Sequence, residues 1–229
     1  MFYKEILKNI LDEIKNGNSL GESITLVGAT KTVPVETINL AITSGLTVVA
    51  ENKVQEFNQK HAFIKGASQH FIGHLQTNKV KYLVGKVDLI HSVDSFHLAQ
   101  AISKQAEKVG SIQDVLVEVN IGGELSKSGI NPENAIDELE QIKKLYGIRV
   151  KGLMAMLPHS KDTALLQNLT LKMREIYDTI KSKDKNFKFL SVGMSSDYKI
   201  AIENGSNMIR IGSLIFGKRN YGETKNGII

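Results

Sequence analysis

Val27-Gly28-Ala29-Thr30-Lys31 decides the fold, because this stretch closes the first apolar, strand-like segment of the chain. An open, doubly wound sheet that binds a dinucleotide needs a turn of the pattern G-x-G-x-x-G at this point. The stretch lacks that pattern and carries a lysine where the strand ends. The first strand therefore argues against an open dinucleotide-binding sheet.

Outward from this stretch, short apolar segments alternate with longer segments of helical periodicity. The predicted strands span residues 24–28, 47–50, 70–73, 87–90, 115–120, 149–154, 189–192 and 208–211. The predicted helices span residues 34–44, 95–109, 131–145, 163–182 and 197–204. A regular alternation of strand and helix requires a parallel sheet with helical crossovers. The eight segments predict an α/β fold, a single (β/α)8 TIM barrel.

An additional amphipathic helix is predicted ahead of the first strand, over residues 3–15. Its apolar stripe consists of Ile6, Leu7, Ile10, Leu11 and Ile14. We expect this stripe to pack on the barrel. Because no linker rich in proline, glycine or serine divides the chain, we expect one domain over residues 1–229. The helix would lie in residues 1–20 and the barrel core in residues 22–221.

The composition excludes several classes of protein. The chain has 229 residues, which suits one barrel, and contains no cysteine, which excludes disulfides and cysteine-ligated metals. No segment resembles a signal peptide or a membrane helix, so we expect a cytoplasmic protein without membrane contact. The formal net charge is +5, but the lysines are spread beside acidic residues, as on a solvated surface. We therefore expect no nucleic-acid partner.

Polar side chains and methionines gather where the predicted strands end. At these ends lie Lys31, Glu51, Asn52, His74, Ser92, Asn120, Met154, Met194, Ser195, Ser196, Arg210, Gly212 and Ser213. Barrel active sites are built at the carboxyl ends of the strands. Lys31 is either a solvated surface cation or an amine near a phosphate site. In the second case a desolvated lysine loses its proton and can add to an aldehyde.

Two polar clusters follow the last two predicted strands. Ser195 and Ser196 follow the seventh strand, and Gly212 and Ser213 follow the eighth. Barrels often bind phosphate here, through hydroxyls and backbone N–H groups at a helix start. Taken alone, each cluster is better explained by a helix cap or a turn glycine. Their occurrence after successive strands favours a phosphate site.

Two further ionisable side chains have more than one interpretation. Arg210 interrupts an apolar run, and it either faces a ligand ring nitrogen or pairs with a carboxylate. His74 is a lone histidine, which is more often structural than catalytic. Because no histidine or carboxylate spacing accompanies it, we expect no metal site.

Several short motifs occur in the order and spacing of a known family. They are Thr30-Lys31-Thr32 with Pro34, Glu51-Asn52, Val54-Gln55-Glu56, His70-Phe71-Ile72-Gly73, Leu75-Gln76, Asn78-Lys79, Asn120, Glu124, Ser126-Lys127, Gly129, Gly152-Leu153-Met154, Gly193-Met194-Ser195, Asp197, Arg210-Ile211-Gly212-Ser213 and Phe216-Gly217. From residue 22 to Tyr221, the chain resembles the pyridoxal phosphate homeostasis proteins. Thr30, Ala50 and Lys53 depart from the family pattern, which favours serine, glycine and an aromatic residue there.

The resemblance implies a barrel like that of alanine racemase, with pyridoxal 5'-phosphate (PLP) as cofactor. It implies a Schiff base on Lys31 and an arginine, Arg210, that faces the pyridine nitrogen. The other cofactor-binding residues that it implies are Asn52, His74, Met194, Ser195, Ser196, Gly212 and Ser213. No residue is assigned a catalytic role.

The resemblance also implies a function in PLP homeostasis, meaning storage, buffering or delivery to PLP-dependent apoenzymes. A permanently cationic arginine disfavours protonation of the pyridine nitrogen and so limits PLP as an electron sink. A two-base racemase also needs a base from a second domain, which we expect to be absent here. We therefore expect no robust catalysis. We also expect a monomer.

Three alternative functions are weighed against this one. The first is an amino-acid racemase of low activity, which would exchange the α-hydrogen of an amino acid with solvent. The second is a phosphate-binding barrel enzyme that acts on a sugar phosphate, which would bind its substrate without absorbing visible light. Nucleic-acid binding is the third.

Overall fold

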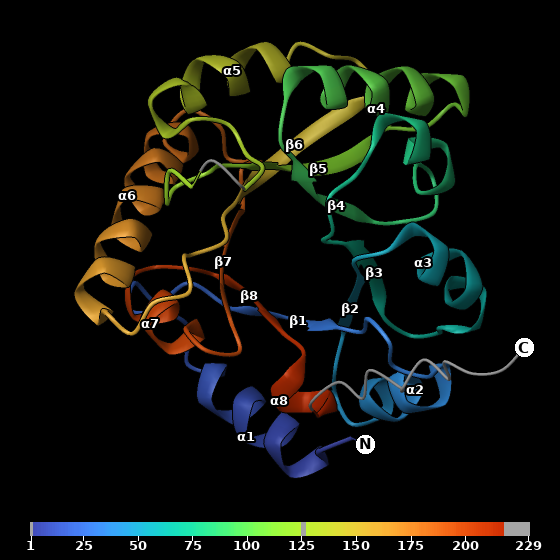
Figure 1. The fold of residues 1–229 in the computed structure, drawn as a ribbon, viewed down its shortest axis with the longest axis vertical. Helices are drawn as coiled ribbons and strands as arrows, with labels where there is room; N and C mark the ends of the chain where they lie inside the picture. Colours follow the sequence, from blue (N-terminus) through green and yellow to red (C-terminus); the bar gives the residue numbers. More distant parts are fainter. Residues whose placement is uncertain (1, 125–126, 218–229) are drawn as a thin grey trace, which may run out of the picture.

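The chain folds into a closed barrel of eight parallel strands, in which β8 pairs with β1 and all other neighbours follow the sequence (Figure 1). The structure, a computed structural model, describes residues 2–124 and 127–217. The predicted (β/α)8 barrel is therefore confirmed. Ser126 and the predicted end of the barrel at Tyr221 lie outside the described residues.

The elements lie close to their predicted places. The strands are β1 (Thr25–Ala29), β2 (Val48–Glu51), β3 (Ser68–Phe71), β4 (Leu89–Val93), β5 (Gln113–Glu118), β6 (Ile148–Met154), β7 (Phe189–Met194) and β8 (Met208–Ile211). The α-helices are α1 (Lys4–Ile14), α2 (Val35–Thr43), α3 (Val54–Lys60), α4 (Phe96–Lys108), α5 (Ala135–Ile142), α6 (Thr163–Lys181), α7 (Tyr198–Glu203) and α8 (Ser213–Phe216). The 3-10 helices are η1 (His61–Phe63), η2 (Thr77–Tyr82) and η3 (Pro132–Asn134).

The structure differs from the predicted elements in the bounds of β3 and β4, which are shifted by two or three residues, in α8, which was not predicted, and in short crossovers. The crossovers after β2 and β3 use α3 and η2, which the sequence analysis did not predict because their apolar periodicity extends over only one or two turns. The predicted helix over residues 131–145 is divided into η3 and α5. Among the described residues, no helix combines the length and apolar character needed to cross a bilayer.

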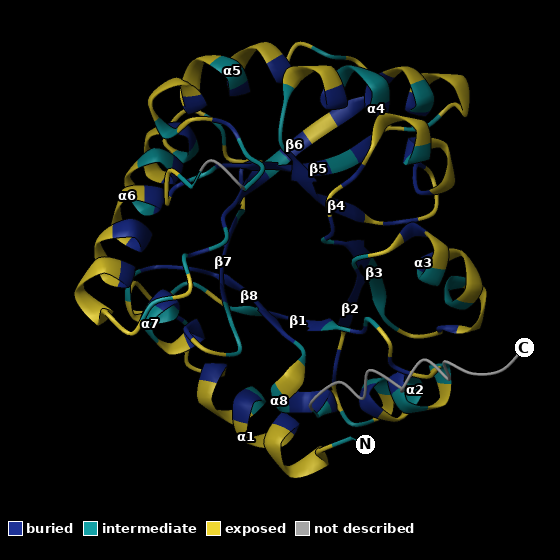
Figure 2. Ribbon diagram, viewed as in Figure 1, coloured by how far each residue is buried: buried dark blue, intermediate teal, exposed yellow. Residues whose placement is uncertain are grey.

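Most strand residues are buried, as expected of parallel barrel strands, although β6 has an exposed residue near its start, and the outer helices expose one face (Figure 2). The lumen is filled by a cluster of apolar side chains from several strands. Its buried members are Val27, Val48, Ala50, Leu89, Leu116, Met154 and Met208. The barrel is therefore a packed core with an open carboxyl rim, rather than a pore.

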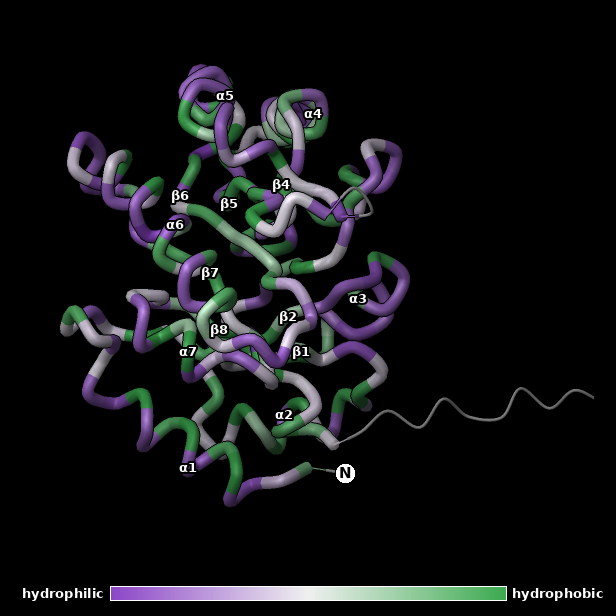
Figure 3. Tube along the Cα trace, turned by 60° about the vertical axis from the view of Figure 1, so that its left-hand side comes forward, coloured by the Kyte–Doolittle hydropathy of each residue, from purple (hydrophilic) through white to green (hydrophobic). Residues whose placement is uncertain are grey.

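Helix α1 packs on the outside of the barrel, against the first and last strands. Leu7, Ile10 and Ile14 are buried in one cluster with side chains of β1 and β8. Figure 3 shows this helix with hydrophobic and hydrophilic residues alternating along it, as an amphipathic helix requires. Ile6 was wrongly included in the packed stripe, because it lies at the flank of the helix and remains 36% exposed.

Candidate functional site

Lys31 lies in the turn that follows β1, at the carboxyl rim of the barrel. The residue before it, Thr30, is fully buried and fastens the turn to β2. The Thr30 amide and hydroxyl both donate to the Ala50 carbonyl, at 2.9 and 3.1 Å, and the hydroxyl lies 2.9 Å from Glu51 Oε1. The lysine is thus carried on a turn whose backbone is fixed by its neighbouring strand.

Lys60 holds the same turn from the end of α3. Its Nζ donates to the Thr30 carbonyl at 3.1 Å and to carboxylate oxygens of Glu51 and Glu56 at 2.8 and 2.9 Å. Glu56 in turn accepts the Thr32 amide at 2.6 Å. Thr32 has a φ of +63°, and no other non-glycine residue that the structure describes has a positive φ. This strained turn is therefore held by a partly buried ionic cluster.

The electrostatics of this cluster follow from its burial. Burial raises the pKa of Glu51 above its usual range, although Lys60 and Thr30 oppose the shift. Burial would also raise the pKa of Glu56, but hydrogen bonds from Lys60 and the Thr32 amide lower it overall. The sequence analysis missed Lys60. The one available signal was its i,i+4 spacing from Glu56.

The predicted phosphate residues lie on the opposite side of β1 from this cluster. Gly212 follows β8 and packs against the end of β1. A side chain at this position would place its Cβ 3.2 Å from the Ala29 carbonyl oxygen and 3.3 Å from the Ala29 Cβ. Ser213 is exposed and begins α8. The structure thus brings Gly212 and Ser213 next to the turn that carries Lys31.

The loop after β7 is organised by Asp197. This buried carboxylate accepts the Met194 amide at 2.6 Å through Oδ1 and the Ser196 hydroxyl at 3.1 Å through Oδ2. Ser195 is half-buried and Ser196 is exposed. Neither serine caps α7, because Asp197 occupies the N-cap position, so the alternative interpretation as a serine cap is wrong here.

Arg210 is buried inside the barrel wall. Its Nη1 donates to the Ser191 carbonyl at 2.7 Å and to the Ser191 hydroxyl at 2.5 Å, and its Nη2 donates to the Ala155 carbonyl at 2.8 Å. Burial lowers its pKa to about 10, while the nearby carboxylates of Glu118 and Asp197 oppose the shift. Arg210 is thus held mainly by neutral oxygens, and it remains a cation at neutral pH.

Glu118, at the end of β5, is a buried carboxyl group that the sequence analysis did not single out. Burial and the charge of Asp94 raise its pKa to about 7, and Arg210 opposes this shift. Its position two residues from lumen-facing Leu116 was the signal that could have found it.

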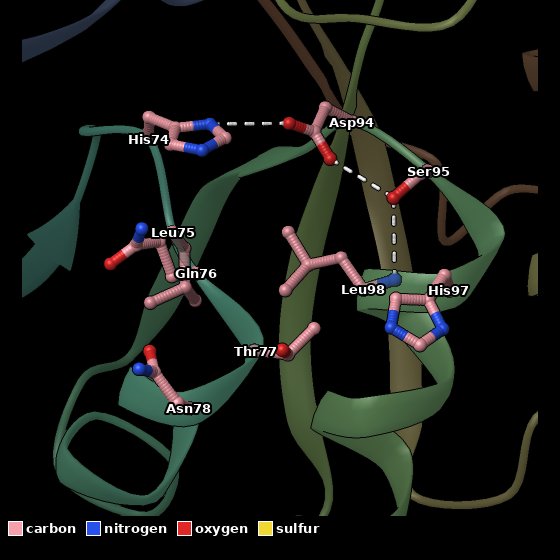
Figure 4. A pocket seen from close by; sticks show the side chains of 9 residues that line it. All are labelled: His74, Leu75, Gln76, Thr77, Asn78, Asp94, Ser95, His97 and Leu98. Carbon is pink, nitrogen blue, oxygen red and sulfur yellow. Dashed lines mark hydrogen bonds and ion pairs between the residues drawn. The ribbon is translucent and has the colours of Figure 1, made fainter.

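His74 and Asn52 lie at the rim between β2 and β4. His74 is 62% exposed, and its Nδ1 lies 3.3 Å from Asp94 Oδ2 (Figure 4). A cavity of about 450 Å³ lies between η2 and the start of α4, and one of about 250 Å³ adjoins it and is lined by both Asn52 and His74. Asn52 Oδ1 is buried without a hydrogen-bond partner among the described residues. It is therefore an acceptor that suits a ligand.

No group of three or more metal-ligating side chains occurs in residues 2–124 and 127–217. The rim instead carries the Lys31 amine, serine hydroxyls, the buried Arg210 guanidinium and the close-packed turn at Gly212. Together with the barrel, these features define a class of protein, the barrels of the alanine racemase type. In agreement, residues 28–220 match the family described as alanine racemase, N-terminal domain.

Individual relatives narrow this class. The chain is 43% identical over 224 residues to the pyridoxal phosphate homeostasis protein of Aquifex aeolicus, with 95% of this chain and 98% of that protein covered. It is 33% identical to the protein of the same name from Pasteurella multocida, with 95% and 96% covered. The chain belongs to the family of pyridoxal phosphate homeostasis proteins.

Solved structures agree with this assignment. PipY of Synechococcus elongatus PCC7942, solved with PLP bound, superimposes with a TM-score of 0.82 at 29% identity, with 93% of this chain and 99% of that chain covered. Alanine racemase of Clostridium difficile gives a TM-score of 0.73 at 20% identity, with 94% of this chain and 57% of that chain covered. The latter likeness shows a shared fold.

Proposed function

We propose that this protein binds PLP, with the Lys31 amine joined to its aldehyde as a Schiff base, and serves PLP homeostasis by storage, buffering or delivery. The observation that carries the proposal is the packing of Gly212 on Ala29, because it sets the turn that we propose for the phosphate beside the lysine turn. The printed names of the relatives and the PLP bound to PipY support it.

The residues present fit PLP. The turn at Gly212 and Ser213 offers backbone N–H groups and a hydroxyl to a dianion, and Ser195 and Ser196 offer further hydroxyls. The orphaned Asn52 Oδ1 offers a buried acceptor. The complete proposed set is Lys31, Asn52, His74, Met194, Ser195, Ser196, Arg210, Gly212 and Ser213.

When bound, PLP supplies an electron sink, and the surrounding residues decide how strongly that sink operates. Arg210 stays cationic, because three carbonyl and hydroxyl contacts stabilise its buried guanidinium. A cation facing the pyridine nitrogen opposes its protonation. We propose on this ground a carrier without robust catalysis, rather than a racemase.

We also propose a domain organisation, an oligomeric state, a location and partners for the protein. We propose one barrel domain with α1 as part of it, which acts as a monomer in the cytoplasm. Its partners would be PLP and the PLP-dependent apoenzymes that receive it, and neither nucleic acid nor membrane. The dispersed lysines support the exclusion of nucleic acid.

The decisive experiment is borohydride reduction of the PLP-loaded protein, followed by peptide mapping. Wild type should absorb visible light, and the reduced cofactor should map to Lys31. Lys31→Ala should lose the fixed cofactor but retain non-covalent PLP in equilibrium dialysis, while the exposed control Lys65→Ala should behave as wild type. Reduction that fixes nothing, or that labels another lysine, would refute the proposal.

A second measurement separates the carrier from the racemase. PLP-loaded protein is incubated with a panel of amino acids in deuterium oxide, and exchange at the α-carbon is followed by NMR. Exchange no faster than with free PLP supports the carrier. Exchange well above that rate would establish the racemase instead.

A further inference from the structure

A continuous line of polar side chains, which we call the file, crosses the interior of the barrel beneath the proposed cofactor site. It begins at Arg210 on β8 and ends at Asp88, which is exposed just before β4. The side chains that link these two ends are Ser191, His91, His70 and Ser68, from β7, β4 and β3. A polar file among the apolar side chains that fill the lumen requires an explanation.

Consecutive members of the file lie within hydrogen-bond distance of one another. Arg210 Nη1 lies 2.5 Å from Ser191 Oγ, which lies 3.4 Å from His91 Nδ1. His91 Nε2 lies 3.0 Å from His70 Nδ1.

The file then reaches the opposite rim. His70 Nε2 lies 3.1 Å from Ser68 Oγ, and Ser68 Oγ donates to Asp88 Oδ2 at 2.7 Å. His91 and Ser191 are fully buried, and His70 is 6% exposed.

The carboxylate end of the file fixes the direction of the hydrogen bonds between neutral imidazoles. A guanidinium only donates and a carboxylate only accepts. Ser191 Oγ therefore accepts from Arg210 and can donate its own proton to His91 Nδ1. An unprotonated Nδ1 places the proton of neutral His91 on Nε2, which donates to His70.

The same reasoning applies to His70 and Ser68. Ser68 Oγ donates its one proton to Asp88, so His70 Nε2 must donate to Ser68 Oγ, and the Nδ1 of neutral His70 must accept from His91 Nε2. Neutral imidazoles in this file therefore carry their proton on Nε2. Burial lowers the pKa of His70 to about 4, against the opposing charge of Asp88, and lowers the pKa of His91 further, with help from His70 and Arg210.

We propose that His91 and His70 are positioning residues for Arg210: the imidazole pair keeps the Ser191 hydroxyl turned as an acceptor, so that the guanidinium holds one orientation toward a ligand. Neither histidine touches the ligand. The role of the histidines in PLP binding rests on the proposed function. The histidine tautomers and the fixed orientation of the Arg210 side chain do not. Through this file, the contact between Ser68 and Asp88 at the opposite rim of the barrel influences the orientation of Arg210, which faces the ligand.

The first test needs no cofactor. In protein labelled with 15N-histidine, the imidazole shifts at pH 7 should show His91 and His70 neutral with the proton on Nε2. In protein labelled with 15N-arginine, the Arg210 side-chain resonances should show slow rotation of the guanidinium. A proton on Nδ1 of His91, or a charged imidazole pair, would overturn the inference.

Variants then separate positioning from packing. His91→Leu removes the acceptor, whereas His91→Asn keeps an oxygen near the place of Nδ1. Ser191→Ala removes one hydroxyl and little volume, so it tests the same link if His91→Leu fails to fold. His61→Asn is the control for loss of a histidine, because His61 lies on η1 outside the lumen and stacks on Phe57.

The readout toward PLP is the 15N shift of its labelled ring nitrogen, together with affinity. His91→Leu and Ser191→Ala should change this shift and weaken PLP binding about tenfold, the value of one lost hydrogen bond. His91→Asn and His61→Asn should leave both close to wild type. An unchanged ring-nitrogen shift and unchanged Arg210 rotation in His91→Leu or Ser191→Ala would overturn the positioning role. Failure of wild type to bind PLP would instead refute the proposed function alone.

Discussion

Gly212 packs on Ala29 so closely that a Cβ at position 212 would lie 3.2 Å from the Ala29 carbonyl oxygen. This contact joins the end of β8 to the end of β1, two residues before Lys31. It exists because the barrel closes, and it sets the distance between the turn proposed for phosphate and the lysine turn.

Gly212→Ala tests this contact. We expect PLP affinity to fall several-fold, because the turn must move by a few tenths of an ångström, and Gly212→Val should have a larger effect. Equilibrium dialysis measures the affinity. Gly122→Ala is the matched control, since its Cβ would meet nothing closer than 3.4 Å. Wild-type affinity in Gly212→Val would contradict a close-packed cradle.

Lys60→Met tests the ionic cluster under the lysine turn. We expect a loss of roughly 3 kcal/mol in the free energy of unfolding, because two partly buried carboxylates lose their common partner. Urea denaturation at pH 7 measures the loss. The exposed control Lys65→Met should change stability by less than about 0.5 kcal/mol. Equal stability of the two variants would show that the cluster is not stabilising.

The buried imidazole pair predicts a pH dependence of stability. Burial lowers the pKa of His70 from its ordinary value of 6.5 to about 4 in the folded protein, so the unfolded chain binds its proton first as the pH falls. The contribution of His70 is therefore full above pH 6.5 and decreases toward pH 4, by about 3 kcal/mol, whereas Glu118, with a pKa of about 7, contributes with the opposite sign in this range. Urea titrations at pH 7, 6 and 5 measure this slope. His70→Gln should lose the His70 contribution, so that stability falls less on acidification than in wild type, and a slope equal to that of wild type would contradict the prediction.

The ion pairs of Glu22 predict a second loss of stability, at lower pH. Burial would raise the pKa of Glu22, but hydrogen bonds from Arg174, Lys181 and Asn18 lower it to about 2. This contribution is present above pH 4.5 and is lost as the pH falls toward 2. Arg174→Met should therefore reduce stability at pH 7 and shift acid unfolding to higher pH, as followed by circular dichroism. Unchanged acid unfolding would mean that Lys181 and Asn18 suffice.

Much of the fold could be predicted because its signals are local. The apolar segments, the intervening helices and the absence of a glycine-rich first turn are each visible within about ten residues, and they indicated the closed barrel. Lys31, Arg210 and Gly212 were recognised for the same reason, since each lies at the end of a strand. The family motifs then indicated the cofactor.

The ionic and histidine networks could not be predicted, because their members come from different strands. Lys60 meets Thr30 across 30 residues, and His91 meets Ser191 across 100 residues. Burial also decides the protonation of Glu118 and His70, and burial at a single position is not a local property of the sequence.

By itself, the sequence determined the order of strands and helices and the chemistry available at each strand end, because hydrophobic periodicity and residue type act over short distances. The tertiary structure alone decided which of those groups meet. Closure of β8 onto β1 brings Gly212 to the lysine turn, and the shared lumen brings His70, His91 and Arg210 into one file. Such contacts depend on the register between strands that are distant in sequence, which no local pattern encodes.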